Sequence, residues 1–336
     1  MSRSPESPAP LRFVDADATE AVLDWKQVIG RLRDAYAQPL KEENAPPRSL
    51  ARGDGVWLRA LAAVPPSSKY MGTKVFGLSR NHSVNYLISL FDQQTGALAA
   101  LIDGYHITAL RTAATSAVAL ECLIPRGRSV SVAVLGSGVE AHGHVRALAS
   151  IRTISSLKVF SPTPGKREAF AQEFSRELGA ACSAAPDGRS AVEGADVVIA
   201  AARSRDETPT LYGAWLAPRA VVVSIGSTLK EQREIDTSVV EACDIIVCDH
   251  VHEVANETGD MVAARAAGID FDAKMISLNE VLSGRAAARL SGAQRPMFKS
   301  VGSALQDVIV AELAFERAVE KGLAIALSAK FRTKQV

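Results

Sequence analysis

The distribution of apolar residues divides the chain into two parts with different periodicities. Up to about Ile124, a stretch of helical periodicity at 17–37 is followed by alternating apolar runs that predict strands at 55–62, 70–77, 85–92 and 98–103. Turn-forming residues separate the last two runs, so an antiparallel or mixed sheet of hairpins is expected. From Thr108 onward, apolar residues recur at helical spacing, which places Arg111 in the first turn of a predicted helix.

After Pro125, apolar runs alternate with helical stretches, which is typical of a right-handed parallel α/β arrangement. Strands are predicted at 130–135, 156–160, 197–201, 220–225 and 245–247, with a weaker one at 274–277. A last helix at 302–321 is expected to return to the first part. The pattern therefore predicts an α/β fold: a doubly wound parallel sheet (residues 125–305) and a discontinuous α+β domain (residues 1–124 and 306–336).

Composition narrows the classes of protein and of partner. The 336 residues exceed one ordinary domain, and 47% hydrophobic content with 5% aromatic residues suits parallel strands buried on both faces. A formal charge of +1 gives no field that attracts a polyanion, so no nucleic-acid partner is expected. No apolar run approaches the ~20 residues that cross a membrane, and the first residues lack the apolar core of a signal peptide. Together with four scattered cysteines, these features predict a cytoplasmic protein without membrane association or disulfides.

A glycine-rich turn follows the first strand of the second part. In the run Gly136-Ser137-Gly138-Val139-Glu140-Ala141, Gly136 permits a tight turn, Gly138 admits a pyrophosphate, and Ala141 allows close packing of the next helix. The bare pattern also occurs by chance, as a structural glycine turn. Because it lies here between a strand and a helix of a Rossmann-type unit, we interpret it as a dinucleotide site.

The end of the following strand bears on the choice of cofactor, because an acidic residue there binds the ribose 2′-hydroxyl of NAD. No acid is present, and Ser161, Thr163, Lys166 and Arg167 offer hydroxyls and cations for a 2′-phosphate, unless they form only a solvated loop. NADP(H) is therefore favoured, with NAD(H) as the alternative. Further cofactor contacts are assigned to Ser137, Val139, Glu140, Ala201, Ala202, Gly226, Val301 and Gly302.

Motifs spread along nearly the whole chain resemble the ornithine cyclodeaminase and mu-crystallin family. They are Arg48, the segments 72–75 and 103–114, the glycine turn, and the run Lys299-Ser300-Val301-Gly302-Ser303-Ala304-Leu305-Gln306-Asp307. The resemblance implies an NAD(P)-binding Rossmann domain and a substrate-binding and dimerisation domain. It also implies a homodimer in which two N-terminal sheets form a shared barrel-like core.

By the same resemblance, Arg48 and Arg111 would hold a substrate carboxylate, and Lys74 would stand beside the reacting carbon and nitrogen. The planar guanidinium fork matches a carboxylate. The alternative for each residue is an ordinary surface cation. However, Lys74 lies within an apolar strand and Arg111 opens an alanine-rich helix, where an unpaired cation is costly.

Two departures from the cyclodeaminase pattern indicate which reaction is run. Thr228 stands where deaminating cyclases have an aspartate, which favours simple reduction. Arg59 stands where they have a glutamate, so the site would repel a distal ammonium and attract a second carboxylate. We therefore expect an imino acid without a distal amine, with a dicarboxylic one as the specific hypothesis. Its far end would lie near Arg59, Arg80, Asn81 or His82; a solvent-facing Arg59 is the alternative.

The predicted function is hydride transfer from NAD(P)H to an α-imino carboxylate, giving an L-amino acid. Lys74 is the expected proton source, and Lys69 the weaker candidate. The alternatives are an ornithine-type cyclodeaminase that uses NAD⁺ catalytically, and a non-catalytic carrier of a small ligand. The ligand-like pairs at 142–144 and 250–252 do not have the setting of a metal site, and no metal is expected.

Overall fold

The computed structural model describes residues 10–329 and 331, which fold as two units. The first unit comprises the chain up to Arg111 and from Ser303 onward, and the second comprises residues 112–302. These units differ from the expected domains chiefly at helix α3 (Tyr105–Leu123), which the sequence pattern assigned wholly to the first domain. In the structure the helix is continuous, and the boundary between the two units falls within it, after Arg111.

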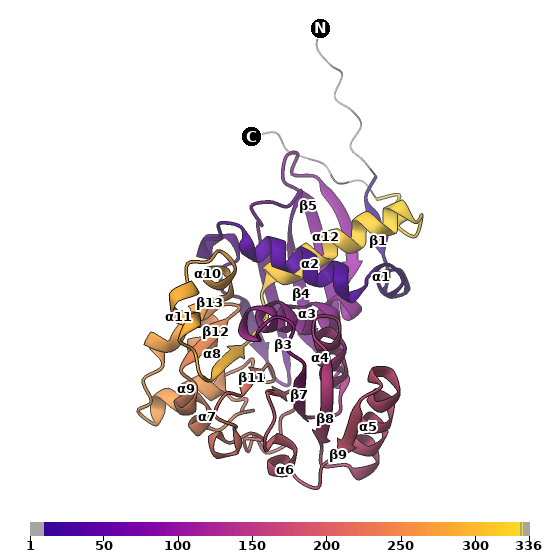
Figure 1. The fold of residues 1–336 in the computed structure, drawn as a ribbon. Coiled ribbons are helices and arrows are strands. Elements are labelled where there is room, and N and C mark those ends of the chain that lie inside the picture. Colours follow the sequence, from indigo (N-terminus) through magenta and orange to yellow (C-terminus); the bar gives the residue numbers. More distant parts are fainter. Residues whose placement is uncertain (1–9, 330, 332–336) are drawn as a thin grey trace. The chain divides into compact units, whose positions relative to one another are not determined.

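The first unit contains a mixed sheet, with strand order β15-β1-β6-β5-β4-β3-β2 among the described residues. Figure 1 labels β1, β3, β4 and β5 of this sheet. Strands β2 to β6 form an antiparallel meander, whereas β1 runs parallel to β6. Four strands lie where alternation predicted them: β3 (Val56–Ala63), β4 (Tyr70–Leu78), β5 (Val84–Asp92) and β6 (Leu98–Asp103). Three short ones escaped prediction: β1 (Arg12–Val14), β2 (Ser49–Gly53) and β15 (Ile325–Ala326).

Two helices replace the single helix expected at 17–37. Helix α1 (Ala16–Val22) ends at Leu23, and α2 (Trp25–Ala37) starts anew because the Asp24 side chain accepts a hydrogen bond from Gln27 N. Such an N-cap satisfies an amide that the helix itself leaves unpaired. A short 3-10 turn, η1 (Glu42–Asn44), follows.

Helix α12 (Ala304–Glu320) lies against strands β3, β4 and β5 and against α2. Leu61, Ile88 and Leu90 of the sheet are buried on this side. Gly72 allows the close approach, because a Cβ there would lie 3.1 Å from Val308 Cγ2 of the helix. The predicted return of the last helix to the first part of the chain is thus observed, and it positions residues 304–308 beside β4.

The second unit is built on a parallel sheet with order β13-β12-β14-β11-β10-β7-β8-β9 among the described residues. Its strands are β7 (Val130–Leu135), β8 (Ile154–Phe160), β9 (Ala181–Ala184), β10 (Val197–Ala200), β11 (Val221–Ser224), β12 (Ile245–Cys248), β13 (Met275–Ser277) and β14 (Pro296–Lys299). The chain moves outward from β7 to β9 and then returns to β10. The carboxyl ends of the neighbouring strands β7 and β10 therefore form the topological switch point, where such sheets bind nucleotides.

Helices connect these strands as expected for a doubly wound sheet, and the predicted α/β fold class is confirmed. They are α4 (Val139–Ala149), α5 (Pro164–Leu178), α6 (Gly188–Val192), α7 (Thr237–Ala242), α8 (Val251–Glu257), α9 (Gly259–Ala266), α10 (Leu278–Leu282) and α11 (Ala287–Ser291), with 3-10 turns η2 (Gly213–Trp215) and η3 (Asp272–Lys274). Among the helices of the described chain, none is both long and apolar enough to span a bilayer.

Candidate active site

Lys74 lies in the middle of β4, on the sheet face that α12 covers. It is 1% exposed, and its Nζ donates hydrogen bonds to Thr108 Oγ1 at 2.7 Å and to Asp307 Oδ1 at 3.0 Å. The rings of Tyr86 and Phe76 lie 4.9 and 5.2 Å from the ammonium. Burial lowers the pKa of Lys74 to about 8; Asp307 acts in the opposite direction, and Arg111 and Arg48 lower it further. This lysine can therefore exchange a proton near neutral pH.

Arg111 is held in place by the first turn of α12. Its Nε lies 3.0 Å from Asp307 Oδ1, and Nη1 donates to Gln306 Oε1 at 2.7 Å. Gln306 in turn donates through Nε2 to Tyr36 Oη at 2.9 Å. The planar guanidinium is thus fixed in orientation by two side chains, which is the requirement for bidentate recognition of a carboxylate.

The cluster of Arg48, Lys74, Arg111 and Asp307 carries more positive than negative charge. Arg48 is half-buried, and it lies close enough to lower the pKa of both Lys74 and Asp307. Burial opposes ionisation of Asp307, but Arg111 and Lys74 outweigh it and hold the pKa of that carboxyl below its usual value. Three cations against one carboxylate leave an excess that an anionic ligand would neutralise.

The sequence did not single out Gln306 and Asp307 as site residues, although both lie in the late motif. Asp307 is 1% exposed and, within residues 10–329, its Oδ2 accepts no hydrogen bond. A usable signal was present: two polar residues open a helix whose following positions are apolar. Such residues are costly to bury unless they meet partners.

Arg59 is 4% exposed, so the solvent-facing interpretation of this residue is wrong. Its guanidinium carbon lies 5.0 Å from the ring centre of Trp57 and 5.8 Å from that of Phe76. Arg59 is paired with Phe76, and the next residue on the same face, Leu61, is paired with Lys74. Arg59 and Lys74 therefore share one face of the sheet, with the Phe76 ring near both cations.

Arg80, Asn81 and His82 lie in the exposed turn between β4 and β5. The side chain of Asn81 accepts hydrogen bonds from Ser79 and Ser83, and His82 has a positive φ of 60°. In the described part of the chain, the hydrogen bonds of this turn stay within it. The structure brings Arg48, Lys74 and Arg111 together, but it does not join the turn to them.

In the second unit, the glycine turn lies at the carboxyl end of β7, at the switch point. Gly136 has a φ of 123°, and a Cβ there would approach Ala201 O to 2.8 Å, so this position requires glycine. Ala202 borders the same residue. Gly138 precedes α4, and a Cβ there would meet open space, while Val139 is 65% exposed. Glu140 lies in the first turn of α4. The start of this helix is therefore accessible to an anion.

The end of β8 combines hydroxyls with a cation. Ser137 donates to Ser161 Oγ at 2.9 Å, and Arg167 Nη1 donates to Ser161 O at 2.9 Å while it lies over the Phe160 ring. Thr163 is exposed immediately before α5. Hydroxyls and a guanidinium thus lie together at the carboxyl end of β8.

Three other residues predicted to contact the cofactor have backbone amides that already donate hydrogen bonds within the second unit. Gly226 N donates to Glu234 Oε2 at 2.9 Å, and Val301 N and Gly302 N donate to the Asp249 carboxylate at 3.0 and 2.8 Å. Any cofactor contact of these residues would use their other atoms. Thr228, which the sequence assigned to the reaction site and not to the cofactor, donates to Gln232 Oε1 through both its amide and its hydroxyl.

The two histidines after the glycine turn contact different groups. Nδ1 of His142 lies 2.9 Å from Gly138 O, whereas His144 is buried, with Nε2 at 2.9 Å from Ser116 Oγ. Burial lowers the pKa of His144 to about 4. His250 accepts a hydrogen bond from Glu253 N at the start of α8. The described residues contain no group of three or more His, Cys, Asp or Glu side chains that could hold a metal ion.

Comparison with known proteins agrees with this arrangement. The sequence model of the ornithine cyclodeaminase/mu-crystallin family matches residues 50–322. The chain belongs to this family. The resemblance read from the motifs is thereby confirmed.

Relatives within the family include several reductases. A Delta(1)-pyrroline-2-carboxylate reductase of Bacillus cereus is 29% identical over 278 residues, or 82% of this chain and 81% of the relative. The ketimine reductase mu-crystallin of Rattus norvegicus is 30% identical over 266 residues, or 77% and 80%. The structure of Thermococcus litoralis Delta(1)-pyrroline-2-carboxylate reductase in complex with NADH and L-proline superimposes with a TM-score of 0.85. That chain is 28% identical, and the match covers 94% of this chain and 100% of the other.

Proposed function

We propose that this protein is an NAD(P)H-dependent reductase of an α-imino carboxylate, which it converts to an L-amino acid. The observation that carries the proposal is the cluster of the buried Lys74, Arg111 and Asp307 with the half-buried Arg48, which has an excess of positive charge. The reductases among the relatives support the same reaction class.

Each residue of the cluster has a definite task in this reaction. Arg48 and Arg111 bind the substrate carboxylate, and Gln306 and Asp307 orient Arg111 for it. Lys74, with a pKa of about 8, holds a proton at Nζ and delivers it near the imine nitrogen. Tyr86 and Phe76 surround the ammonium and exclude water from it.

The residues at the switch point fit a nicotinamide dinucleotide. Gly136 and Gly138 leave room for a pyrophosphate, and the accessible start of α4 attracts its charge. When bound, the cofactor supplies the hydride that reduces the imine carbon. The preference for NADP(H) over NAD(H) is supported by Ser161, Thr163 and Arg167 at the end of β8, and by the absence of an acid at 160–163.

The substrate that we favour is a dicarboxylic imino acid. Its support is the burial of Arg59 on the same sheet face as Lys74, held over aromatic rings rather than turned to solvent. A guanidinium in this setting is suited to a second carboxylate at the far end of the substrate. The exposed turn of Arg80, Asn81 and His82 is a weaker source of contacts.

A homodimer is supported by the other face of the first sheet. On this face Leu58 of β3 and Leu87 of β5 are about half-exposed, at 53% and 45%. Exposed leucines on a sheet face suit an interface with a second protein surface. We also place the protein in the cytoplasm, whose reducing conditions suit its free cysteines. The oligomeric state is measured by light scattering during size-exclusion chromatography; a monomer at micromolar concentration would contradict the dimer.

The proposed reaction is tested by following NADPH absorbance with purified protein. Candidate imines form from pyruvate, glyoxylate or oxaloacetate with ammonia or methylamine, and pyrroline- and piperideine-2-carboxylate are tested beside them. We expect NADPH consumption with at least one imino acid, and the highest efficiency with the oxaloacetate imine. Ammonia release from ornithine without NADPH consumption would instead indicate a cyclodeaminase. Binding of these compounds without turnover would indicate a carrier.

A further inference from the structure

Three fully buried ionisable side chains, to which the proposed mechanism gives no role, lie at the carboxyl edge of the parallel sheet. Glu234, Asp260 and Lys299 each have 0% exposure. Lys299 is the last residue of β14, and its neighbour in the adjacent strand β11 is Ser224. The group thus lies where β11 and β14 end, next to two segments that carry predicted cofactor contacts.

Glu234 binds the backbone that follows β11. Its Oε2 accepts hydrogen bonds from Ser224 Oγ at 2.7 Å and from the amides of Ile225 and Gly226, both at 2.9 Å. Lys299 Nζ donates to Ser224 Oγ at 2.7 Å, so Ser224 links the lysine to the carboxylate.

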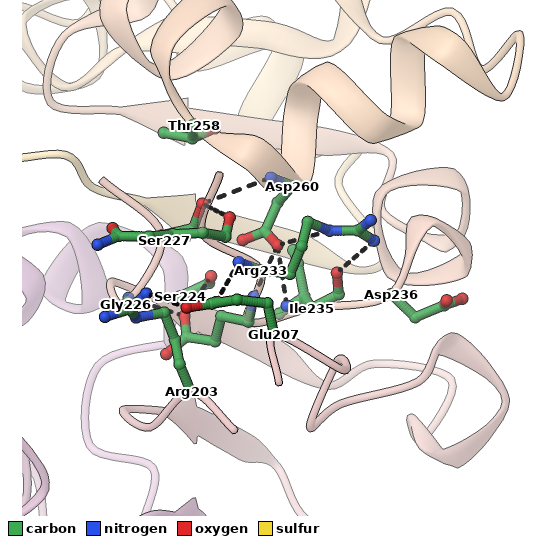
Figure 2. A network of polar contacts seen from close by, with 12 residues as sticks. Arg203, Glu207, Ser224, Gly226, Ser227, Arg233, Ile235, Asp236, Thr258 and Asp260 are labelled. Carbon is green, nitrogen blue, oxygen red and sulfur yellow. Dashed lines mark hydrogen bonds and ion pairs between the residues drawn. The ribbon is translucent and has the colours of Figure 1, made fainter. Parts of the chain in front are cut away.

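Asp260 holds the other side of the network, as Figure 2 shows. Its Oδ1 accepts hydrogen bonds from the amides of Glu234 at 2.8 Å and Ile235 at 3.1 Å, and Arg233 Nε lies 3.4 Å away. Its Oδ2 accepts from Lys299 Nζ at 2.8 Å. The Asp260 amide lies 3.4 Å from Ser227 Oγ, which connects α9 to the same turn.

The two oxygens of Glu234 have different surroundings. Oε2 receives three donors, whereas Oε1 is buried and, within residues 10–329, has no hydrogen-bond partner. A Cβ on Gly226 would collide with Oε1, so the carboxylate lies directly against the Gly226 backbone. Glu234 therefore contacts residue 226 both through a hydrogen bond to its amide and by direct packing.

Lys299 from β14 and Asp260 from α9 are the charges that act on Glu234. The neighbouring Arg233 pairs with Asp260, and Arg203 and Glu207 form an ion pair beside Gly226. Burial raises the pKa of Glu234 to about 7; Lys299 opposes this shift, and Asp260 adds to it. The carboxyl therefore gains and loses its proton near neutral pH.

We propose that Glu234 positions the turn at residues 224–228 for the nicotinamide cofactor, and that its ionised form does so more tightly than its protonated form. The inference rests on the proposed function, which places the cofactor at this edge of the sheet. Hydrogen bonds to an ionised acceptor are stronger than those to a neutral one, so ionisation tightens the hold on the Ile225 and Gly226 amides. The turn carries both Gly226 and Thr228. Glu234 thus acts through the backbone, as a positioning residue.

The test is the pH dependence of cofactor binding, measured by titration of NADH fluorescence between pH 6 and pH 8. NADH is the probe because the 2′-phosphate of NADPH itself titrates near pH 6. For the wild-type protein, we expect the dissociation constant to fall about fivefold from pH 6 to pH 8, the difference between a charge-assisted and a neutral hydrogen bond. In Glu234→Gln the amide oxygen can accept the same three donors without a charge. This variant should keep its pH 6 affinity at pH 8.

Two further variants make the test specific. Glu312→Gln changes a carboxyl of α12 in the first unit that is also buried and whose pKa is also raised by burial. It should retain the wild-type pH profile. Ser224→Ala removes a hydrogen bond that lowers the pKa of Glu234, so the transition should move to higher pH.

The outcomes separate this inference from the proposed function. A wild-type protein that binds neither NADH nor NADPH would refute the proposed function itself. If the wild-type protein binds NADH but Glu234→Gln keeps the full pH dependence, only the role of Glu234 is refuted. If Glu234→Gln does not fold, the test rests on Ser224→Ala. A pH transition of NADH binding that shifts to higher pH in this variant supports the inference, and an unchanged transition overturns it.

Discussion

The two units of this protein each contain a buried lysine paired with a buried aspartate, and the two pairs differ in what surrounds them. Lys74 and Asp307 in the first unit are accompanied by Arg111 and Arg48, so three cations face one carboxylate. Lys299 and Asp260 in the second unit are accompanied by Arg233 and Glu234, so two cations face two carboxyls. Both lysine–aspartate pairs are buried, so burial does not distinguish the two networks. The balance of positive and negative charge around each pair does.

This difference indicates how a ligand site can be told from a structural network. A buried network with equal numbers of cations and carboxyls needs no charge from a ligand, and its groups fix the backbone around it. A buried cluster with residual charge is satisfied only when a ligand of opposite sign arrives. The excess of positive charge in the first unit is what the proposed substrate site rests on, whereas the network of the second unit is assigned to the proposed cofactor edge.

The sharpest test of the comparison replaces Lys74 by methionine. We expect kcat to fall about 10²- to 10⁴-fold, the usual contribution of a proton donor, with little change in cofactor affinity. Steady-state kinetics with the best imine of the substrate panel measure this. Lys69→Met removes the weaker candidate, an exposed lysine that directly precedes β4, and it should leave kcat nearly unchanged. A Lys74→Met enzyme with most of its kcat would remove this residue from the mechanism.

The corresponding change in the second unit, Lys299→Met, should act on stability. It leaves Asp260 and Glu234 buried with Arg233 as the nearest cation, and breaking a buried ion pair costs about 3–5 kcal/mol. Lys74→Met should cost less, because Asp307 keeps Arg111 at 3.0 Å. Urea unfolding of both variants gives the comparison. Equal losses of stability would show that charge balance does not distinguish the two networks.

The role of Arg59 is examined by replacement with glutamine. We expect KM for a dicarboxylic imine to rise about tenfold, as for loss of a charge-assisted hydrogen bond, with kcat nearly unchanged. KM for pyrroline-2-carboxylate should not change, because it lacks the second carboxylate. Arg80→Gln in the exposed hairpin turn is the control. If KM rises for the control and not for Arg59→Gln, the far carboxylate lies at the turn instead.

The pH dependence of the reaction follows from Lys74. Because the protonated lysine is the donor and its pKa is about 8, kcat/KM should fall above pH 8, by about tenfold per pH unit. Asp307→Asn removes the charge that raises this pKa, so the inflection should move to lower pH. The same shift affects stability: the unfolded state binds more protons between about pH 8 and 10.5, so the free energy of unfolding due to this group rises with pH there. An inflection unmoved in Asp307→Asn would assign the titration to another group.

The smallest expected effect concerns the choice of cofactor. Arg167→Ala should weaken NADPH binding about fivefold and leave NADH binding unchanged, because a partly exposed cation contributes about 1 kcal/mol to phosphate binding. Arg176→Ala, in the last turn of the same helix, is the control. Calorimetric titration with each cofactor measures both. Equal effects on NADH and NADPH would argue against a 2′-phosphate site at Arg167.

The amino-acid sequence by itself determined the features that depend on neighbouring residues. Strand β7 at 130–135 and the turn at Gly136 follow from an apolar run that ends in glycine, and the positive φ of Gly136 is a local requirement. The break between α1 and α2 was also local, because Asp24 is a good N-cap, but the longer apolar periodicity obscured it. The lysine within an apolar strand and the arginine opening a helix marked the cation cluster in the same way.

Only the tertiary structure decided which distant residues meet. Strand β14 forms between β11 and β12, and its four residues carry too little pattern to be recognised without these neighbours. The pairing of Lys74 with Asp307 joins residues 233 positions apart, and that of Lys299 with Asp260 joins residues 39 positions apart. A buried charge is stable only beside its partner, and the chain supplies that partner by folding, at a separation that no local pattern records.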